Sequence, residues 1–324
     1  MLIDLLRIAV GLVALIYAAD RLVRSAVRIS RAFGVSVVLI GAVIVGFGTS
    51  VPEFVVSALA ALSGELDLAV SNVVSSNTAN VTLVLGSAAV ITPIVAKWRI
   101  IKREGALMFA TVALLAAFVA NMEISAWEGL VLLALLGVSI WMMIRWSSAD
   151  PEAVAAQIGE VDEAPGESAG AAPIAVWRST VGREILVGIV ALVVTVIAAD
   201  FLLDGVVGIG ERFGLSAVFL GLITGVGTSL PELAAGIAAA RHREPELVLG
   251  NVLGSNVFNS LGVIGLAAVV GPGSLTELTI PFLAIMVASA FLAGVFSMSG
   301  QRINRLEGAA LLAFFALYAV YAFI

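Results

Sequence analysis

The sequence predicts an all-α membrane protein with ten transmembrane helices, arranged as two inverted five-helix repeats. Three observations support this fold class: an apolar composition, ten separate apolar segments, and a set of polar motifs that occurs twice. Of the 324 residues, 61% are hydrophobic and 12% are charged, and the mean hydropathy is +1.12. Soluble domains contain about 45–50% apolar and about 25% charged residues. The composition therefore excludes a water-soluble enzyme.

The ten apolar segments fall into two groups of five, separated by a polar interval. Each is long enough for a transmembrane helix, which needs about 20 apolar residues. The interval 147–182 is rich in Ala, Gly, Pro, Glu and Asp, which predicts a flexible acidic linker between repeats at 1–146 and 183–324. The predicted spans are 2–27, 35–62, 68–96, 105–122, 126–146, 184–207, 215–240, 246–271, 278–298 and 303–324.

The basic residues predict how the chain is oriented. With ten spans, alternate connections lie on the same side of the membrane, and every Lys and Arg except Arg7 and Arg212 then falls on one side. The positive-inside rule places that side in the cytoplasm. We therefore expect a multi-pass protein of the cell membrane, with a cytoplasmic linker and both termini outside.

Rare side-chain types narrow the possible chemistry. The chain contains no cysteine and one histidine, His242. Disulfides, thiolate metal ligands and cysteine nucleophiles are therefore excluded, and neither a histidine metal centre nor a Ser-His mechanism is expected. We expect His242 to be a solvated loop residue. The sequence also contains no evident nucleotide-binding loop, so it favours neither an intramembrane enzyme nor a primary pump.

Polar motifs recur in the two halves with the same spacing. Since each half holds five predicted spans, an odd number, the halves would enter the membrane in opposite senses. Inverted repeats of this kind are typical of transporters whose site lies near the midplane. The paired motifs are Tyr17-Ala-Ala-Asp20 with Ile197-Ala-Ala-Asp200, Gly48-Thr-Ser-Val-Pro-Glu53 with Gly227-Thr-Ser-Leu-Pro-Glu232, and Ser71-Asn-Val-Val-Ser-Ser-Asn-Thr-Ala-Asn80 with Gly250-Asn-Val-Leu-Gly-Ser-Asn-Val-Phe-Asn259.

Two carboxylates, Glu53 and Glu232, fall well inside predicted spans. A charge near the centre of a membrane helix costs about 2.5–3.5 kcal/mol on insertion scales, and such residues usually serve ion or proton pathways. A structural ion pair is the alternative, but no Lys or Arg lies at comparable depth in any span. Pro52 and Pro231 precede the glutamates, so we expect interrupted helices that expose backbone carbonyls to cations.

Hydroxyl and amide side chains surround the glutamates at helical spacing. Any of the amides could instead hold helices together, and we assign Asn72 and Asn251 mainly to packing. The ligand set contains oxygen only, which suits Ca²⁺ better than Mg²⁺, and Na⁺ accepts the same oxygens. The residues concerned are Thr49, Ser50, Thr228 and Ser229 beside the glutamates, and Asn72, Ser76, Asn80, Asn251, Ser255 and Asn259 on the following spans.

The two glutamates also predict a response to acid. Together they would neutralise one Ca²⁺. Without a cation they would repel each other in a site that disfavours charge, so we expect at least one to bind a proton. Protons should then compete with the metal, and transport should fall as the medium is acidified.

The paired GTS-x-PE and GN-x-x-GSN-x-x-N segments resemble the alpha repeats of the cation/calcium exchanger superfamily, specifically prokaryotic sodium/calcium exchangers. The resemblance implies electrogenic exchange of Na⁺ for Ca²⁺ by alternating access, with spans one and six sliding against the remaining bundle. The ligands that it implies are Glu53, Glu232 and the carbonyls of Thr49 and Thr228 for Ca²⁺; the same glutamates with Ser50, Ser76, Ser229, Ser255 and the carbonyls of Gly46 and Gly225 for Na⁺; and Asn80 and Asn259 at the central position.

This chain departs from the family pattern in two places. Ser71 and Ser75 replace glycines of the first GN-x-x-GSN segment, which we expect to loosen helix contact or to add hydroxyl groups. Some relatives carry Asp where this chain has Asn80 or Asn259, so here the site contains two acids only. H⁺ as the counter-ion, another divalent cargo and, on weaker grounds, a passive cation channel therefore remain as alternatives. The expected partners are Ca²⁺, Na⁺ and the lipid bilayer, without a cofactor or nucleic acid, and we expect a functional monomer.

Overall fold

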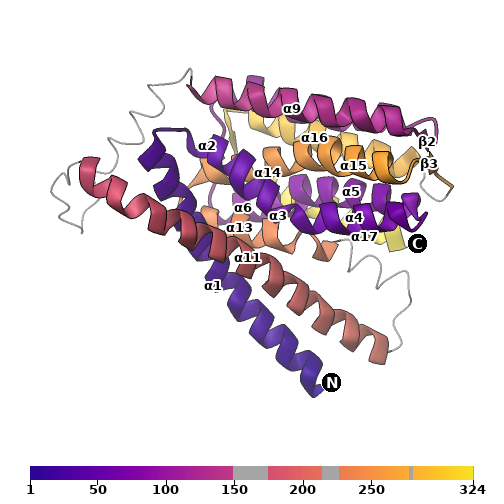
Figure 1. Ribbon diagram of the computed structural model, residues 1–324, viewed down its shortest axis with the longest axis horizontal. Helices are drawn as coiled ribbons and strands as arrows, with labels where there is room; N and C mark the ends of the chain where they lie inside the picture. The colour runs from indigo at the N-terminus through magenta and orange to yellow at the C-terminus, as the bar shows by residue number, and fades with distance from the viewer. Residues whose placement is uncertain (149–173, 214–225, 277–279, 324) are drawn as a thin grey trace.

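The chain is almost entirely helical in the computed structural model (Figure 1). Its described part contains seven helices long and apolar enough to cross a membrane, or eight if one bent pair counts as a single span. The predicted helical membrane fold is confirmed at this level. The predictions for most of the linker and for the start of the seventh span lie outside the described residues, which are 1–148, 174–213, 226–276 and 280–323.

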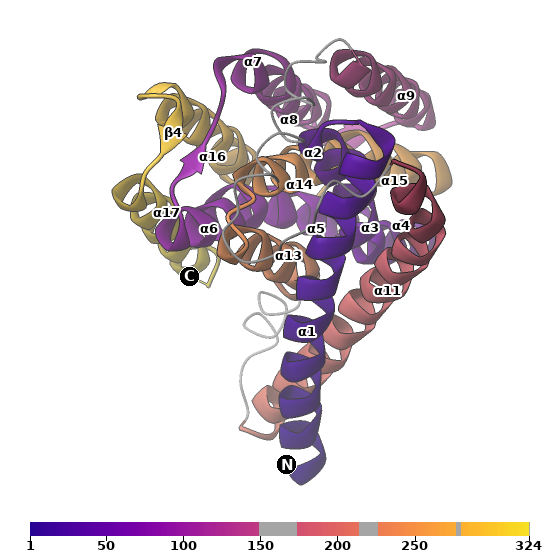
Figure 2. The same ribbon diagram turned by 90° about the vertical axis from the view of Figure 1, so that its left-hand side faces the viewer.

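Two long helices, α1 (Leu2–Phe33) and α11 (Ile174–Arg212), pack side by side and project together from the rest of the molecule (Figures 1 and 2). α11 begins inside the interval expected as linker. Ion pairs join the two helices near both ends, with Arg28 Nη1 2.9 Å from Glu184 Oε1 and Arg212 Nε 2.8 Å from Asp4 Oδ2. The pair therefore forms one structural unit.

The second predicted span is a broken helix. The run from Val37 to Thr49 and helix α4 (Val51–Leu62) are bent by 43° at Ser50. Pro52 lies in the first turn of α4, where its missing N–H leaves no hydrogen bond unmade. The predicted interruption before Glu53 is thus confirmed. The segments of the first run are α2 (Val37–Leu39), η1 (Ile40–Gly46) and α3 (Phe47–Thr49).

The second half repeats this start. Helix α13 (Leu230–Arg241) follows Ser229 and carries Pro231 in its first turn. Glu53 and Glu232 consequently occupy equivalent positions, one residue after the proline of each helix. The residues before 226 that would complete the second broken helix lie outside the described part.

Two continuous helical runs form the centre of the bundle. An 18-residue apolar stretch of the first run is 72% buried and that of the second is 89% buried, whereas the corresponding stretches of the other membrane-length helices are 17–28% buried. Each contains a π-helical turn, and these turns hold Asn80 and Asn259. Such turns are frequent at functional sites. The runs are α5 (Leu66–Ala79), η2 (Asn80–Val84) and α6 (Leu85–Ile91), and α14 (Pro245–Val257), η5 (Phe258–Val263) and α15 (Ile264–Val270).

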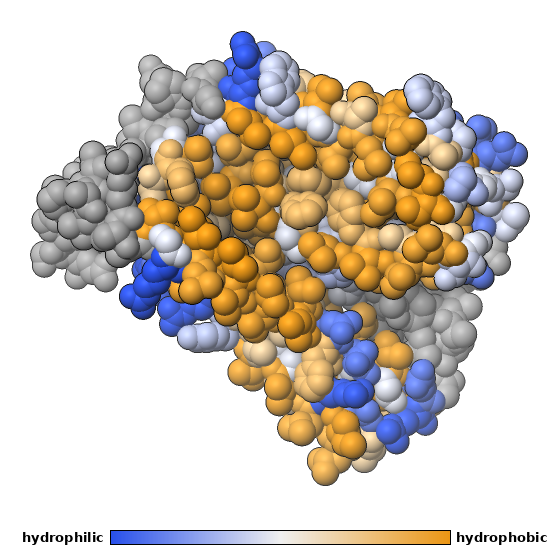
Figure 3. Space-filling model, in the orientation of Figure 1, coloured by the Kyte–Doolittle hydropathy of each residue, from blue (hydrophilic) through white to orange (hydrophobic). Residues whose placement is uncertain are grey.

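The outer helices expose apolar side chains, which cover much of the face in Figure 3. The all-α prediction is not fully met, because the connections between helices contain two short antiparallel strand pairs. The strands satisfy the hydrogen-bonding groups of the backbone in these connections. β1 (Ile94–Val95) pairs with β4 (Arg302–Ile303), and β2 (Glu123–Ile124) with β3 (Gly273–Ser274). The outer helices are α7 (Trp98–Ile100), η3 (Ile101–Gly105), α8 (Ala106–Val119), α9 (Ala126–Ser148), α16 (Ile280–Met298) and α17 (Arg305–Phe323).

Glycine allows α14 to touch the backbone of the broken helix. A Cβ on Gly254 would lie 2.2 Å from the carbonyl oxygen of Ala42. The equivalent position in the first half is Ser75, whose hydroxyl lies 2.8 Å from the hydroxyl of Tyr318 on α17. Of the two effects expected for Ser75, looser helix contact or an added hydroxyl group, the structure shows the second. The hydroxyl group contacts the outer helix α17.

Replacing Gly254 by alanine should destabilise the protein. The added methyl group would force α14 away from η1, and overpacking of this kind costs about 1–3 kcal/mol. Gly294→Ala on α16 is the matched control, since nothing lies within 4 Å of its added carbon. Thermal unfolding in detergent measures both variants. An unchanged melting temperature for Gly254→Ala would contradict the close contact.

Candidate functional site

The structure brings the two predicted glutamates together, with both side chains fully buried. Each accepts a hydrogen bond from a serine of the other half: Ser50 Oγ lies 3.0 Å from Glu232 Oε1, and Ser229 Oγ lies 3.4 Å from Glu53 Oε1. In the described ranges no ion pair joins either glutamate to a basic side chain, so the structural ion pair considered from sequence is not observed there.

Further hydrogen bonds cross between the halves around this pair. Thr49 Oγ1 lies 3.4 Å from Asn251 Oδ1, and Thr228 Oγ1 lies 3.3 Å from Asn72 Oδ1. Asn72 in turn donates to Ser57 Oγ at 3.1 Å. Asn72 and Asn251, assigned mainly to packing from sequence, therefore contact the threonines of the opposite half. The spacing within one half gives no sign of a contact made with the other.

Within the part of the chain that the structure describes, several buried polar atoms of the site have no hydrogen-bond partner. They are Oε2 of Glu53, Oε2 of Glu232, and both side-chain polar atoms of Asn80 and of Asn259. Leaving a buried polar group unsatisfied costs about 1–3 kcal/mol, and more for charged groups. Because the oxygens among these atoms come from both halves and include two carboxylates, those oxygens fit a position where a cation supplies the missing partner.

The remaining candidate ligands that the structure describes are buried as well. The Gly46 carbonyl accepts a hydrogen bond from Ser255 Oγ at 3.2 Å, which links it to the other half. Gly225 lies outside the described residues. The other buried candidate side chains are Thr49, Ser50, Ser76, Asn80, Thr228, Ser229, Ser255 and Asn259.

A cavity of about 570 Å³ leads from the surface to the helix breaks. Its inner wall includes Pro52, Thr228 and Pro231, next to the glutamates in sequence. The outer part lies between the projecting ends of α1 and α11. The charged residues that line it are Asp4, Arg7, Asp200, Asp204, Glu211 and Arg212. Carboxylates at such a mouth would attract cations.

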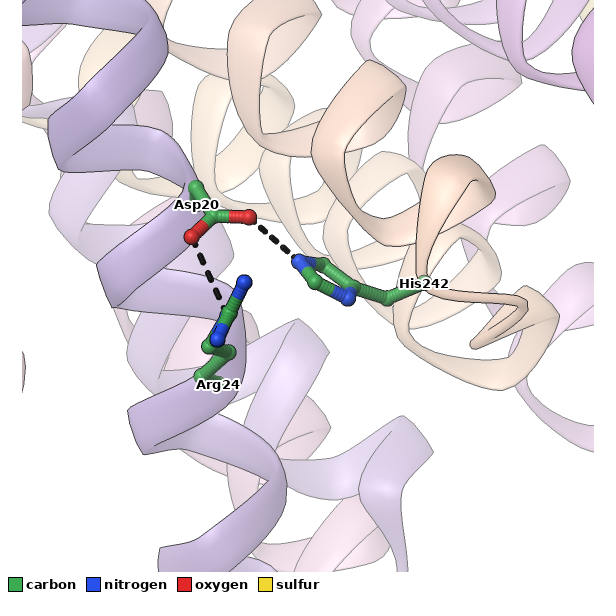
Figure 4. A network of polar contacts seen from close by, with 3 residues as sticks. All are labelled: Asp20, Arg24 and His242. Atoms are coloured by element: carbon green, nitrogen blue, oxygen red, sulfur yellow. Dashed lines mark hydrogen bonds and ion pairs between the residues drawn. The ribbon is translucent and has the colours of Figure 1, made fainter. Parts of the chain in front are cut away.

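Just past the middle of α1, a polar contact that the sequence did not predict joins this helix to the end of α13. His242, expected to be a solvated loop residue, has a side chain only 28% exposed, and its Nε2 bonds Asp20 Oδ1 (Figure 4). The other carboxylate oxygen of Asp20 lies 3.0 Å from Arg24 Nε. The expectation for His242 was wrong because the end of α13 returns against α1, a neighbour far away in sequence.

The sequence also matches known proteins over nearly its whole length. The model of a family described as sodium/calcium exchanger protein matches residues 3–145 and 184–324. The antiporter candidate CaxA of Alkalimonas amylolytica is 35% identical over 325 residues, 98% of each chain. The sodium/calcium exchanger MaX1 of Methanosarcina acetivorans is 27% identical over 99% of each chain. A solved structure of the sodium-calcium exchanger NCX_Mj has a TM-score of 0.83 at 26% identity, covering 98% of each chain.

Removing the crossing serines should weaken cation binding. Ser50→Ala and Ser229→Ala each delete a hydroxyl that touches the glutamate of the other half, and a lost hydrogen bond of about 0.5–1.5 kcal/mol predicts a twofold to tenfold lower affinity. Isothermal titration with Ca²⁺ and Na⁺ measures it. Ser75→Ala is the control, because its hydroxyl bonds Tyr318. Equal losses in all three variants would argue against the site.

Proposed function

Because the chain belongs to the sodium/calcium exchanger protein family, we propose that it is a secondary antiporter that exchanges Na⁺ for Ca²⁺ by alternating access. The observation that carries the proposal is the buried pair Glu53 and Glu232, each with one carboxylate oxygen that has no hydrogen-bond partner among the described residues. The family is one of exchangers, that is, of transporters.

The proposed architecture is ten membrane spans in two inverted five-helix repeats, at 1–146 and 183–324, joined by the acidic segment 147–182. The equivalent positions of Glu53 and Glu232 in α4 and α13 support it, as do the π turns at Asn80 and Asn259. The one-sided distribution of Lys and Arg supports a cell-membrane protein with a cytoplasmic linker and external termini.

Shared ligands explain why the two ions would exchange. Ca²⁺ would be held by Glu53, Glu232 and the carbonyls of Thr49 and Thr228, whose oxygen chemistry and two negative charges suit one divalent cation. Na⁺ would use the same glutamates. Since both ions need these carboxylates, binding of one ion would lower the affinity of the site for the other. The proposed Na⁺ ligands completing the set are Ser50, Ser76, Ser229, Ser255 and the carbonyls of Gly46 and Gly225, with Asn80 and Asn259 at the centre.

Alternating access would come from the unit formed by α1 and α11. This unit bounds the 570 Å³ cavity, and its ion pairs at both ends favour movement as one body. Sliding of the unit against the remaining bundle would close this cavity and open a second route on the other side of the glutamates.

Proton-coupled exchange is the second candidate function. It is favoured by the acid count, since the central positions Asn80 and Asn259 are amides and the glutamates are the only carboxylates of the site. A proton on a glutamate could then replace Na⁺ as the competing ion. The experiment below separates the two.

Purified protein in liposomes loaded with Na⁺ should take up Ca²⁺ only while an outward Na⁺ gradient exists. Glu53→Gln and Glu232→Gln should each reduce uptake by at least about tenfold, because a neutral amide cannot balance a buried divalent charge. Radioactive ⁴⁵Ca²⁺ uptake measures the flux. Glu65→Gln on an exposed loop is the matched control and should transport normally.

Other outcomes would select other functions. Uptake driven equally by a pH gradient without Na⁺ would favour proton coupling. Flux that persists without any counter-ion gradient would indicate a channel. Full activity in both glutamine variants would contradict the site.

Acidification should inhibit exchange. A protonated carboxyl group carries no charge for the cation, so protons and Ca²⁺ compete for the glutamates. The competition predicts that the apparent KM for Ca²⁺ rises as pH falls while the maximal rate at saturating Ca²⁺ changes less. Initial rates over a series of pH values test this, and a KM independent of pH would contradict it.

A further inference from the structure

We propose that Asp20 and His242 are positioning residues of the transport cycle, forming a latch that holds the exchanger in the conformation seen here. The inference rests on the alternating-access part of the proposed function. It concerns which of the two openings the protein favours, and it assigns no ligand to either residue.

Among the described residues, the latch joins the C-terminal half of α1 to the connection between α13 and α14. Besides the contact between Asp20 and His242, Arg31 Nη2 of α1 lies 3.6 Å from Glu244 Oε1, and Glu244 belongs to the same connection between α13 and α14 as His242. At the other end of the unit lies the open cavity that reaches Thr228. In the described residues these polar contacts therefore lie on the C-terminal half of α1, whereas the cavity lies towards its N-terminal end.

The connection that carries His242 is held in an unusual shape. Arg243 has φ of 58°, in the left-handed region that an arginine rarely adopts. Such a conformation persists only when its surroundings determine it. The backbone N–H groups of His242, Arg243 and Glu244 all donate to carbonyls in the last turns of α13. The connection thus presents His242 and Glu244 to α1 from a rigid base.

The sequence repeat shows that the latch has no equivalent in the opposite half. Asp20 corresponds to Asp200, which lines the cavity, but His242 corresponds to Ser63, an exposed residue with a short neutral side chain. In a conformation with the openings exchanged, Asp200 would approach Ser63 and gain no such contact. The chain therefore favours the present opening over the reverse one.

The lack of cysteine makes this bias measurable by labelling. Val56 lines the present cavity, whereas the equivalent Ala235 is buried. Single cysteines at these positions, Val56→Cys and Ala235→Cys, report on the two openings through their rates of maleimide labelling in nanodiscs. Val207→Cys at the mouth of the cavity controls for reagent access.

Breaking the latch should expose the second reporter. Asp20→Asn and His242→Gln should each speed labelling of Ala235→Cys about tenfold to a hundredfold, in line with loss of a hydrogen bond to a charged group. Their combination should add little, since both remove one contact. Arg21→Gln, which removes an exposed charge from the same helix, should leave the rate unchanged.

A gain-of-contact variant guards against mere unfolding. Ser63→His should give Asp200 a partner in the reverse conformation and so slow labelling of Val56→Cys, an effect that additional Asp200→Asn should cancel. Unchanged Ala235→Cys rates in both latch variants, or equal acceleration by Arg21→Gln, would overturn the proposal. Labelling requires no transport, so it tests the latch separately from the exchange reaction. If the latch variants change the labelling rates but the protein does not exchange Na⁺ for Ca²⁺, only the proposed choice of transported ions is refuted.

Discussion

Placing two carboxylates inside an apolar bundle is the constraint on which the rest of this structure depends. Glu53 and Glu232 are fully buried and have no basic partner in the described ranges. Charges in such a position are tolerated only where other groups compensate them. Ser50 and Ser229 supply part of that compensation by donating hydrogen bonds to the glutamate of the other half, and in the described residues one oxygen of each carboxylate has no hydrogen-bond partner.

The backbone is shaped to deliver those oxygens. A continuous α-helix uses its carbonyls internally, so ligands from the backbone require a break. The 43° bend at Ser50, with Pro52 in the next turn, provides one, and the start of α13 at Ser229 and Pro231 repeats it. The central runs α5–α6 and α14–α15 add π turns at the asparagines. Irregular backbone is tolerated at this depth because protein surrounds it.

The two halves are alike at the site and unlike around it. Gly254 presses on the backbone of Ala42, whereas its counterpart Ser75 bonds Tyr318. His242 reaches Asp20, whereas its counterpart is Ser63. The proposed ligands come from both halves, which accounts for the likeness at the centre. Nothing requires the two openings to be equally stable, so the periphery is free to differ.

The sequence alone determined the helical membrane character, the pairing of the polar motifs and the break before Glu53, because these follow from composition, local periodicity and the missing N–H of proline. It also singled out the residues that converge in the site. Only the tertiary structure decided which side chains meet: that Ser50 serves Glu232, that Asn72 reaches Thr228, and that His242 is bound by Asp20. These contacts join residues far apart in the chain, and their existence depends on how the helices pack, which no local pattern encodes.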